Sequence, residues 1–135
     1  LMKELPKNLL MVKADKEKIT SLINNLIANS FKATAKDGNI SLKVSAYKDE
    51  ECKDRDFVIV AVEDTGMGIP EMELDKVFEK FTTAGASHAH EKFSGLGLGL
   101  PLAKEIIGLH EGKIWIDSKW GKGTKISFTL PVIKE

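Results

Sequence analysis

The fold of this chain is decided by one stretch, Phe57-Val-Ile-Val-Ala-Val62-Glu-Asp64-Thr-Gly66-Met-Gly68-Ile-Pro70. Its first half is apolar and mostly β-branched, which predicts a strand buried on both faces at the centre of a sheet. The Asp-x-Gly-x-Gly segment follows at once, and its glycines let the backbone turn sharply and let a flat ring approach closely. Two interpretations remain: a plain strand-ending turn, or one wall of a binding site.

Periodicity on either side of this stretch predicts the other elements. A helix follows the N-cap residue Asp15, with apolar residues at helical spacing on one stripe. Alternating patterns predict strands at 40–47, 113–118 and 124–130, and a Gly121-Lys-Gly123 turn joins the last two as a hairpin. The apolar run Leu9–Val12 predicts an edge strand.

Two further helices are expected. A short one covers 71–78, and a longer one starts near Gly97, because Pro101 fits only a first helical turn. Its predicted core face consists of Leu98, Leu102, Ala103, Ile106 and Ile107. The predicted fold class is α+β: a two-layer α/β sandwich with a mixed, mostly antiparallel sheet of about five strands and about three helices on one face.

The bulk properties exclude several functions. The 135 residues include 20 basic and 20 acidic side chains, and this zero net charge argues against nucleic acid or an anionic membrane as a partner. The single Cys52 excludes an intrachain disulfide and fits a reducing compartment. No long apolar run predicts a membrane span. We expect one domain, residues 1–135, excised from a longer cytoplasmic or membrane-anchored protein.

Polar residues on the first helix suggest phosphate chemistry. Asn25, Asn29 and Lys32 stand at i, i+4 and i+7, so they share one stripe. An amide oxygen can ligate Mg²⁺ while substrate phosphates supply the charge, and a lysine can pair with a phosphate. A solvated polar face is the competing interpretation.

The central segment suggests a base pocket. An ionised carboxylate only accepts hydrogen bonds, so Asp64 suits the exocyclic amine of adenine better than the carbonyl of guanine. Met67 and Ile69 would line the apolar wall.

The third motif is Gly95-Leu96-Gly97-Leu98-Gly99-Leu100, between an irregular loop, 82–94, and a helix. Glycine amides near a helix start make an anion site. It fits neither a Rossmann fingerprint, since Leu100 replaces the third glycine, nor a Walker A loop, since no Gly-Lys-Ser/Thr follows. A phosphate-binding lid and a flexible hinge both remain open.

The order of these motifs resembles the GHKL ATP-binding superfamily over residues 8 to 131, above all the catalytic ATP-binding domain of sensor histidine kinases. Its N, G1, F and G2 boxes correspond to the segments at 25–32, 64–70, 77–81 and 95–99. The resemblance implies the Bergerat ATP-binding fold, with ATP and Mg²⁺ as cofactors and a flexible ATP lid at about 82–96.

The resemblance also implies roles for single residues. Asn29 would ligate Mg²⁺, with Asn25 and Lys32 beside the phosphates as the catalytic set. Asp64 would bind the adenine amine, and the Thr124 hydroxyl would help to hold adenine, often through water. The implied ATP-binding set is completed by Gly66, Gly68, Ile69, Gly95, Leu96, Gly97, Leu98 and Gly99.

The chain departs from the family pattern in the lid. Relatives often carry Arg or Lys soon after the F box, whereas Thr82-Thr83-Ala84 stands here. Lys80 and Lys92 are the candidate replacements for a γ-phosphate contact. Leu96 replaces a common Thr or Ser, and Pro101 replaces a common Ala.

The residue type at position 25 differs between the ATPases and the histidine kinases of this superfamily. ATPases such as gyrase and MutL carry a Glu there that activates water, but an amide cannot take a proton at neutral pH. A histidine acceptor needs no such base. We therefore expect a protein-histidine kinase domain that phosphorylates a His on a separate dimerisation domain, with a response regulator downstream and the domain itself monomeric. Two alternatives remain: a stand-alone serine kinase of the anti-sigma type, and a non-catalytic ATP-gated interaction module.

The chain's own histidines are not the expected acceptor. His88 and His90 fall in the expected lid, and His110 falls at the C-terminal end of the second long helix, where a cation is favourable.

Overall fold

The computed structural model describes residues 2–4, 12–34, 36–74 and 100–133. Its strands are β1 (Met2–Glu4), β2 (Ile40–Lys48), β3 (Asp56–Asp64), β4 (Ile114–Lys119) and β5 (Gly123–Pro131). Its helices are α1 (Lys16–Ala33), α2 (Glu71–Leu74) and α4 (Leu100–Leu109).

The strands form one sheet in the order β1-β2-β3-β5-β4. β1 pairs with β2 in parallel, and the other neighbours are antiparallel. The sheet is therefore mixed and mostly antiparallel, with β3 at its centre. Both the class and the central strand are confirmed.

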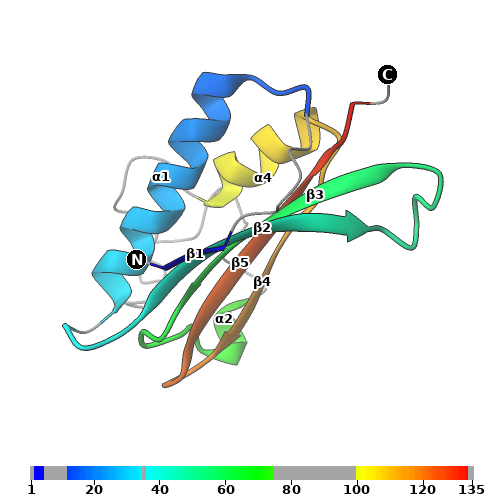
Figure 1. Ribbon diagram of the computed structural model, residues 1–135. Helices are drawn as coiled ribbons and strands as arrows, with labels where there is room; N and C mark the ends of the chain where they lie inside the picture. The colour runs from blue at the N-terminus through cyan, green and yellow to red at the C-terminus, as the bar shows by residue number, and fades with distance from the viewer. Residues whose placement is uncertain (1, 5–11, 35, 75–99, 134–135) are drawn as a thin grey trace.

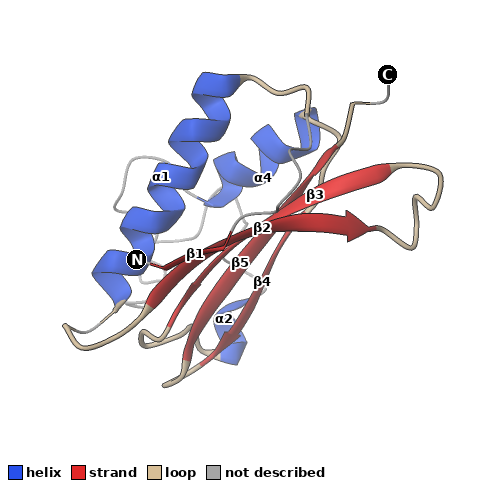
Figure 2. Ribbon diagram, viewed as in Figure 1, coloured by secondary structure: helices blue, strands red, loops and turns tan. Residues whose placement is uncertain are grey.

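Helices α1 and α4 lie side by side along one side of the sheet (Figures 1 and 2). The short α2 lies at the other end of the sheet from the C-terminus of α4, beside β4 (Figure 1). Asp15 caps α1 as predicted, and its side chain accepts a hydrogen bond from the N–H of Lys18 at 3.2 Å. Helix α1 begins near the C-terminal end of α4 and ends at the opposite end of the sheet (Figure 1).

The hydrophobic core fills the space between these two helices and the sheet. Alternate residues of β3 and β5 face it, because the pairing sets Val58, Val60 and Val62 opposite Leu130, Phe128 and Ile126. The helices contribute Leu22, Leu26, Leu100, Ala103 and Ile107. Each of these side chains is at most 7% exposed, so the apolar stripe predicted for α1 is confirmed as its packing face.

The other face of the sheet is partly covered by its own aromatic residues. The rings of Tyr47 on β2 and Trp115 on β4 lie 5.9 Å apart. Phe57 is only 3% exposed, and the guanidinium of Arg55 lies 5.9 Å from its ring centroid. Among the described residues, large side chains rather than helices therefore cover part of this face.

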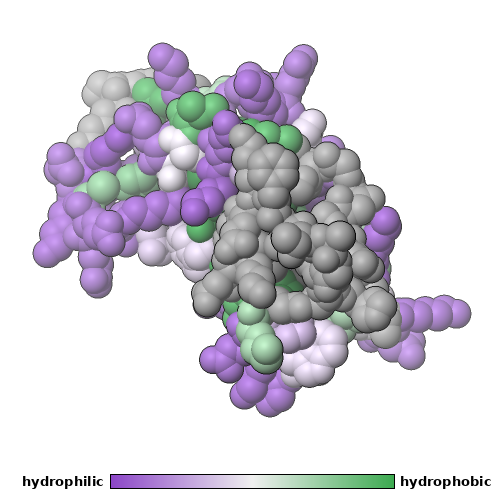
Figure 3. Space-filling view, turned by 180° about the vertical axis from the view of Figure 1, so that it is seen from behind, coloured by the Kyte–Doolittle hydropathy of each residue, from purple (hydrophilic) through white to green (hydrophobic). Residues whose placement is uncertain are grey.

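The described surface seen from behind is mainly hydrophilic, with green hydrophobic residues in small separate areas (Figure 3). The most exposed large hydrophobic side chains of the described residues are spread along the chain: Phe31, Met72, Leu102, Leu109, Trp120 and Ile133.

One prediction is wrong, and another concerns a segment that lies mostly outside the described residues. Of the expected edge strand 9–12, only Val12 is described, and it forms an isolated bridge with Val132. The edge position beside β2 belongs to Met2–Glu4, whose pairing partners lie far along the chain. Leu102 is 42% exposed rather than buried, because the buried stripe of α4 runs through Leu100, Ala103 and Ile107.

Candidate functional site

A polar row crosses the core-facing side of the sheet at the end next to α2. The pairing register sets Ile40, Asp64, Thr124 and Ser118 in one line across β2, β3, β5 and β4. The neighbouring core-facing rows are apolar, so the change to carboxylate and hydroxyl groups is abrupt. Asp64 and Thr124 are each only 4% exposed. A hollow of about 460 Å³ lies here, lined by Asp64, Leu74, Ile116, Ser118, Thr124 and neighbouring lysines among others.

Asp64 is held rigidly at this end of β3. One carboxylate oxygen, Oδ1, accepts a hydrogen bond from the buried N–H of Gly66 at 2.9 Å. This Asx-type turn fixes the side chain, and Oδ2 has no hydrogen bond to any other residue that the structure describes. The role of Asp64 as an acceptor for an amine stays a prediction.

The loop after Asp64 packs against the C-terminal end of α1. The N–H of Met67 donates to the carbonyl oxygen of Ala33 at 3.3 Å. A Cβ atom on Gly66 would lie 2.4 Å from that same oxygen, closer than any side chain allows. Gly66 therefore permits the helix bearing Asn25 and Asn29 to meet the loop bearing Asp64.

The β4–β5 hairpin packs against the other side of the loop that follows Asp64. The N–H of Gly121 donates to the carbonyl of Met67 at 2.6 Å. Gly68 has a φ of +77° and lies against the carbonyl of Lys119. Ile69 is fully buried, and its N–H donates to Ser118 Oγ at 2.7 Å. The second motif is thus clamped between α1 and the hairpin, as a rigid pocket wall requires.

The polar stripe of α1 is only partly solvated. Asn29 is 3% exposed, Asn25 is half-buried and Lys32 is exposed. Asn25 Nδ2 donates to the carbonyl of Ser21 in its own helix at 2.8 Å. Burial of an asparagine on this stripe counts against the interpretation as a plain solvated face.

Two buried oxygens near the end of α1 have no hydrogen-bond partner in the described part of the chain: Asn29 Oδ1 and Thr34 Oγ1. An unpaired buried acceptor costs about 1–3 kcal/mol, so such groups in native proteins commonly serve a ligand. The Asn29 oxygen is a suitable hard ligand for Mg²⁺. The chemistry of this residue therefore fits the expected cation, although the described residues form no cluster of acidic, His or Cys ligands.

The remaining predicted residues fall outside the described ranges. These are the F-box segment 77–81, the lid 82–96, the candidate phosphate contacts Lys80 and Lys92, and the G2-box residues Gly95, Leu96, Gly97, Leu98 and Gly99. Their predicted roles stay predictions.

Ser118 was missed by the sequence reasoning. The alternation along β4 could have identified it. Ile114, Ile116 and Ser118 are every second residue of the strand and face the core, so the third of these positions carries a hydroxyl. A polar residue in the apolar phase of a strand indicates a hydrogen-bonded or functional position.

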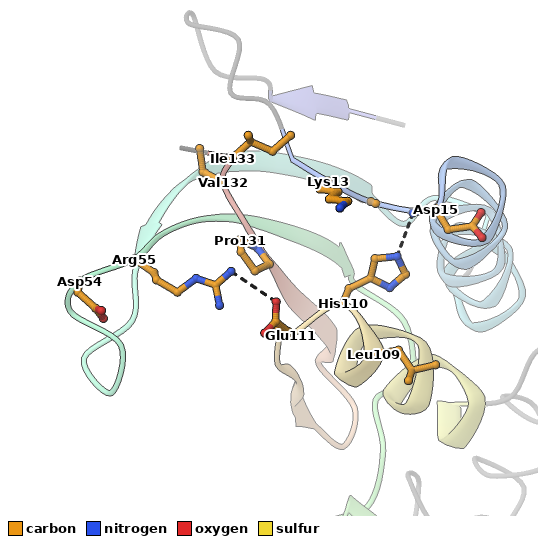
Figure 4. Close-up of a pocket in the computed structure, with 11 residues that line it drawn as sticks. Lys13, Asp15, Asp54, Arg55, Leu109, His110, Glu111, Pro131, Val132 and Ile133 are labelled. Carbon is orange, nitrogen blue, oxygen red and sulfur yellow. Dashed lines mark hydrogen bonds and ion pairs between the residues drawn. The ribbon is translucent and has the colours of Figure 1, made fainter. Parts of the chain in front are cut away.

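A second, larger hollow of about 780 Å³ lies at the opposite end of the sheet and contains none of the predicted site residues. His110 lines it, and its Nε2 accepts a hydrogen bond from the N–H of Asp15 at 3.0 Å (Figure 4). Its Nδ1 lies 2.7 Å from the carbonyl oxygen of Ile106. The imidazole therefore links the start of α1 to the last turn of α4 through two hydrogen bonds. An ion pair of 3.6 Å joins Arg55 and Glu111 across the same hollow (Figure 4).

No helix among the described residues is long and apolar enough to cross a membrane.

Comparison with known proteins identifies the family of the chain. Residues 14–134 match the family model described as histidine kinase-, DNA gyrase B- and HSP90-like ATPase. The sensor histidine kinase WalK of Bacillus subtilis strain 168 is 38% identical over 133 residues, which are 98% of this chain and 21% of the relative. The adaptive-response sensory kinase SasA of Crocosphaera subtropica is 38% identical over 134 residues, 99% of this chain and 33% of the relative.

Solved structures agree as well. The nucleotide-free catalytic domain of the histidine kinase ThkA superposes with a TM-score of 0.74 at 30% identity, covering 96% of this chain and 76% of that domain. This chain spans about a fifth to a third of the full-length kinases named above. With this match over nearly its whole length, the chain belongs to the histidine kinase-, DNA gyrase B- and HSP90-like ATPase family, as an ATP-binding catalytic domain of the sensor histidine kinase type.

Proposed function

We propose that this chain binds Mg-ATP and transfers the γ-phosphoryl group to a histidine on a separate dimerisation domain of the same kinase. A response regulator would then take the phosphoryl group. The observation that carries the proposal is the buried Asp64 carboxylate, which Gly66 fixes through Oδ1 and whose Oδ2 bonds no other residue among those described. It recognises an amine, and it lies beside the helix that carries Asn29 and Lys32.

The phosphate end of the site would be organised by α1. Asn29 would hold Mg²⁺ through its unpaired Oδ1, and the bound cation would supply neutralisation of phosphate charge. Exposed Lys32 would pair with a phosphate oxygen. Catalysis of this kind consists of positioning and charge stabilisation, with the imidazole nitrogen forming the new P–N bond as the γ-phosphorus leaves ADP.

Asn25 favours transfer to histidine over hydrolysis. Its amide cannot take a proton from water, and Nδ2 is engaged with Ser21 on its own helix. A serine acceptor would need a base to activate its hydroxyl, whereas a neutral imidazole is nucleophilic near pH 7. The anti-sigma type of serine kinase is therefore the weaker candidate.

The test is calorimetric titration with a non-hydrolysable ATP analogue, with and without Mg²⁺. Asp64→Asn keeps an acceptor for the Gly66 N–H but presents an amide N–H₂ to the adenine amine, so we expect at least tenfold weaker binding with little change in stability. Asp37→Asn, the same change at an exposed turn, is the matched control. Equal binding by the two variants would exclude Asp64 as the adenine contact.

A second titration addresses the cation. Asn29→Ala should lose most of the Mg²⁺-dependent gain in affinity while keeping the Mg²⁺-independent part. Transfer is then followed with a His-containing helical domain as acceptor, and an acid-labile product identifies phosphohistidine. An acid-stable product would favour the serine kinase, and tight binding without transfer would favour the ATP-gated module.

A further inference from the structure

The hydroxyl of Ser118 joins three parts of the pocket. Its Oγ lies 2.7 Å from the N of Ile69, 3.0 Å from the carbonyl oxygen of Gly123 and 2.9 Å from Thr124 Oγ1. No other described side chain links the Asp-x-Gly-x-Gly loop to both residues that open β5. Ser118 is half-buried, so its hydroxyl is only partly accessible to water.

Proton counting sets the direction of these bonds. A serine hydroxyl has one proton and two acceptor positions. The N–H of Ile69 occupies one acceptor position, and the proton goes to the Gly123 carbonyl. The remaining position faces Thr124, so Thr124 donates its own proton to Ser118. Only this direction satisfies all three neighbours of Ser118 at once.

These bond directions determine what the Thr124 hydroxyl can offer to a ligand. Once its proton points at Ser118, Thr124 Oγ1 offers only lone pairs to a ligand. Asp64 stands directly opposite on β3, equally buried, and its carboxylate also only accepts. The two residues therefore form a pair of acceptors with no proton to donate.

Such a pair discriminates between purines at C6. Adenine carries an amino group there, and its two protons suit both acceptors in direct contact. Hypoxanthine carries a carbonyl oxygen, which would meet two acceptors without any proton between them. A site whose polar groups are left unpaired by the wrong ligand rejects that ligand strongly.

We infer that Ser118 is a positioning residue for base selection: it fixes Thr124 as an acceptor, so that the pocket admits a 6-amino purine and rejects a 6-oxo purine. This inference rests on the proposed function, because it assumes that Asp64 and Thr124 face the base.

The experiment compares ADP and IDP, which differ in the C6 group and the N1 proton, by calorimetry on the parent and on Ser118→Ala. In the variant the Thr124 hydroxyl can rotate and donate to the carbonyl of IDP. We expect the preference for ADP to fall by about three- to tenfold, the net effect of one hydrogen bond. Ser118→Thr keeps the hydroxyl and should restore the preference.

Thr124→Val tests whether Ser118 acts on base selection through Thr124. It removes the hydroxyl at nearly constant volume, so adding Ser118→Ala to it should leave the ADP preference unchanged if Ser118 acts through Thr124. If Ser118→Ala does not fold, as thermal melting would reveal, Ser118→Cys takes its place, because a thiol is a weak acceptor for Thr124.

A role confined to holding Ile69 predicts a different result. Affinity for ADP and IDP would then weaken by the same factor, and the unchanged preference would overturn the inference while leaving the proposed function intact. A parent that binds neither nucleotide would instead overturn the proposed function, and the inference with it.

Discussion

The N–H of Met67 donates to the carbonyl oxygen of Ala33 across 3.3 Å. Ala33 ends α1, and Met67 lies in the loop after β3, so this bond joins the helix of Asn29 to the loop of Asp64. The two halves of the expected nucleotide site, one for phosphate and one for base, meet at this point.

Gly66→Ala should break this junction. Its Cβ would lie 2.4 Å from the Ala33 carbonyl oxygen and 2.9 Å from Asp64 Oδ1, and a backbone atom cannot move aside cheaply. We expect a loss of about 1–3 kcal/mol in unfolding free energy, typical of overpacking, and weaker nucleotide binding. Urea denaturation and calorimetry measure the two effects.

Gly108→Ala is the matched control. Gly108 lies on the exposed side of α4 with no atom within 4 Å of an added Cβ. Since alanine is a better helix former, this variant should be more stable by up to about 1 kcal/mol. Equal losses in the two variants would show that Gly66 has no special packing role.

Most of the fold could be predicted because its signals are local. The stripe of α1 and the alternation in β2, β4 and β5 identify these elements within two or three residues at each end. β1 could not be predicted in this way, since three residues carry no period and their partners on β2 are some 40 positions away. Leu102 was predicted to lie in the core because the periodicity of a helix indicates an apolar face but does not show which residues at the edge of that face are buried.

Some residues of the candidate site could be predicted because their chemical type and motif suggest a role. Asp64 and Asn29 were identified from their motifs, and the structure places both in buried positions. Ser118 was not, because its importance lies in three hydrogen bonds to residues up to 49 positions away. Such contacts depend on sheet register, which the sequence alone does not specify across non-adjacent strands.

His110→Ala should destabilise the domain. The imidazole links the start of α1 to the end of α4, and its loss leaves the N–H of Asp15 and the carbonyl of Ile106 without this partner. We expect a loss of about 1–2 kcal/mol, measured by urea denaturation at pH 7.5. Glu111→Gln, which removes only an exposed ion pair with Arg55, should change stability by less than about 1 kcal/mol. If both variants match the parent, the His110 bonds contribute nothing.

Asp49 should make stability depend on pH in the acid range. The N–H of Glu51, and then Lys113 at 3.1 Å, hold the pKa of Asp49 below its ordinary value of 3.8. A lowered pKa in the folded state means that this stabilisation is complete above about pH 4 and is lost as the pH falls through the folded pKa. The pKa of Lys113 is raised by Glu51 and Asp49, so its charge persists throughout this range.

Asp49→Asn is the test of this dependence. The difference in unfolding free energy between parent and variant should be constant from pH 7 to about pH 5 and should shrink below pH 4. Denaturation at a series of pH values measures it, with the exposed neighbour Glu50→Gln as the control. A difference that grows on acidification would contradict the assignment of Asp49 as the titrating group.

Asn25→Glu should convert slow ATP hydrolysis into faster hydrolysis. The half-buried side chain at this position lies one turn before Asn29, and a carboxylate there supplies the proton acceptor that an amide lacks. Release of inorganic phosphate should rise by about tenfold or more over the parent, within the range of general-base catalysis. Asn25→Gln has the same length without the base, so its rate should not rise. If the parent already hydrolyses ATP rapidly, or if the two variants show the same rate, position 25 does not control the choice between water and histidine as the acceptor.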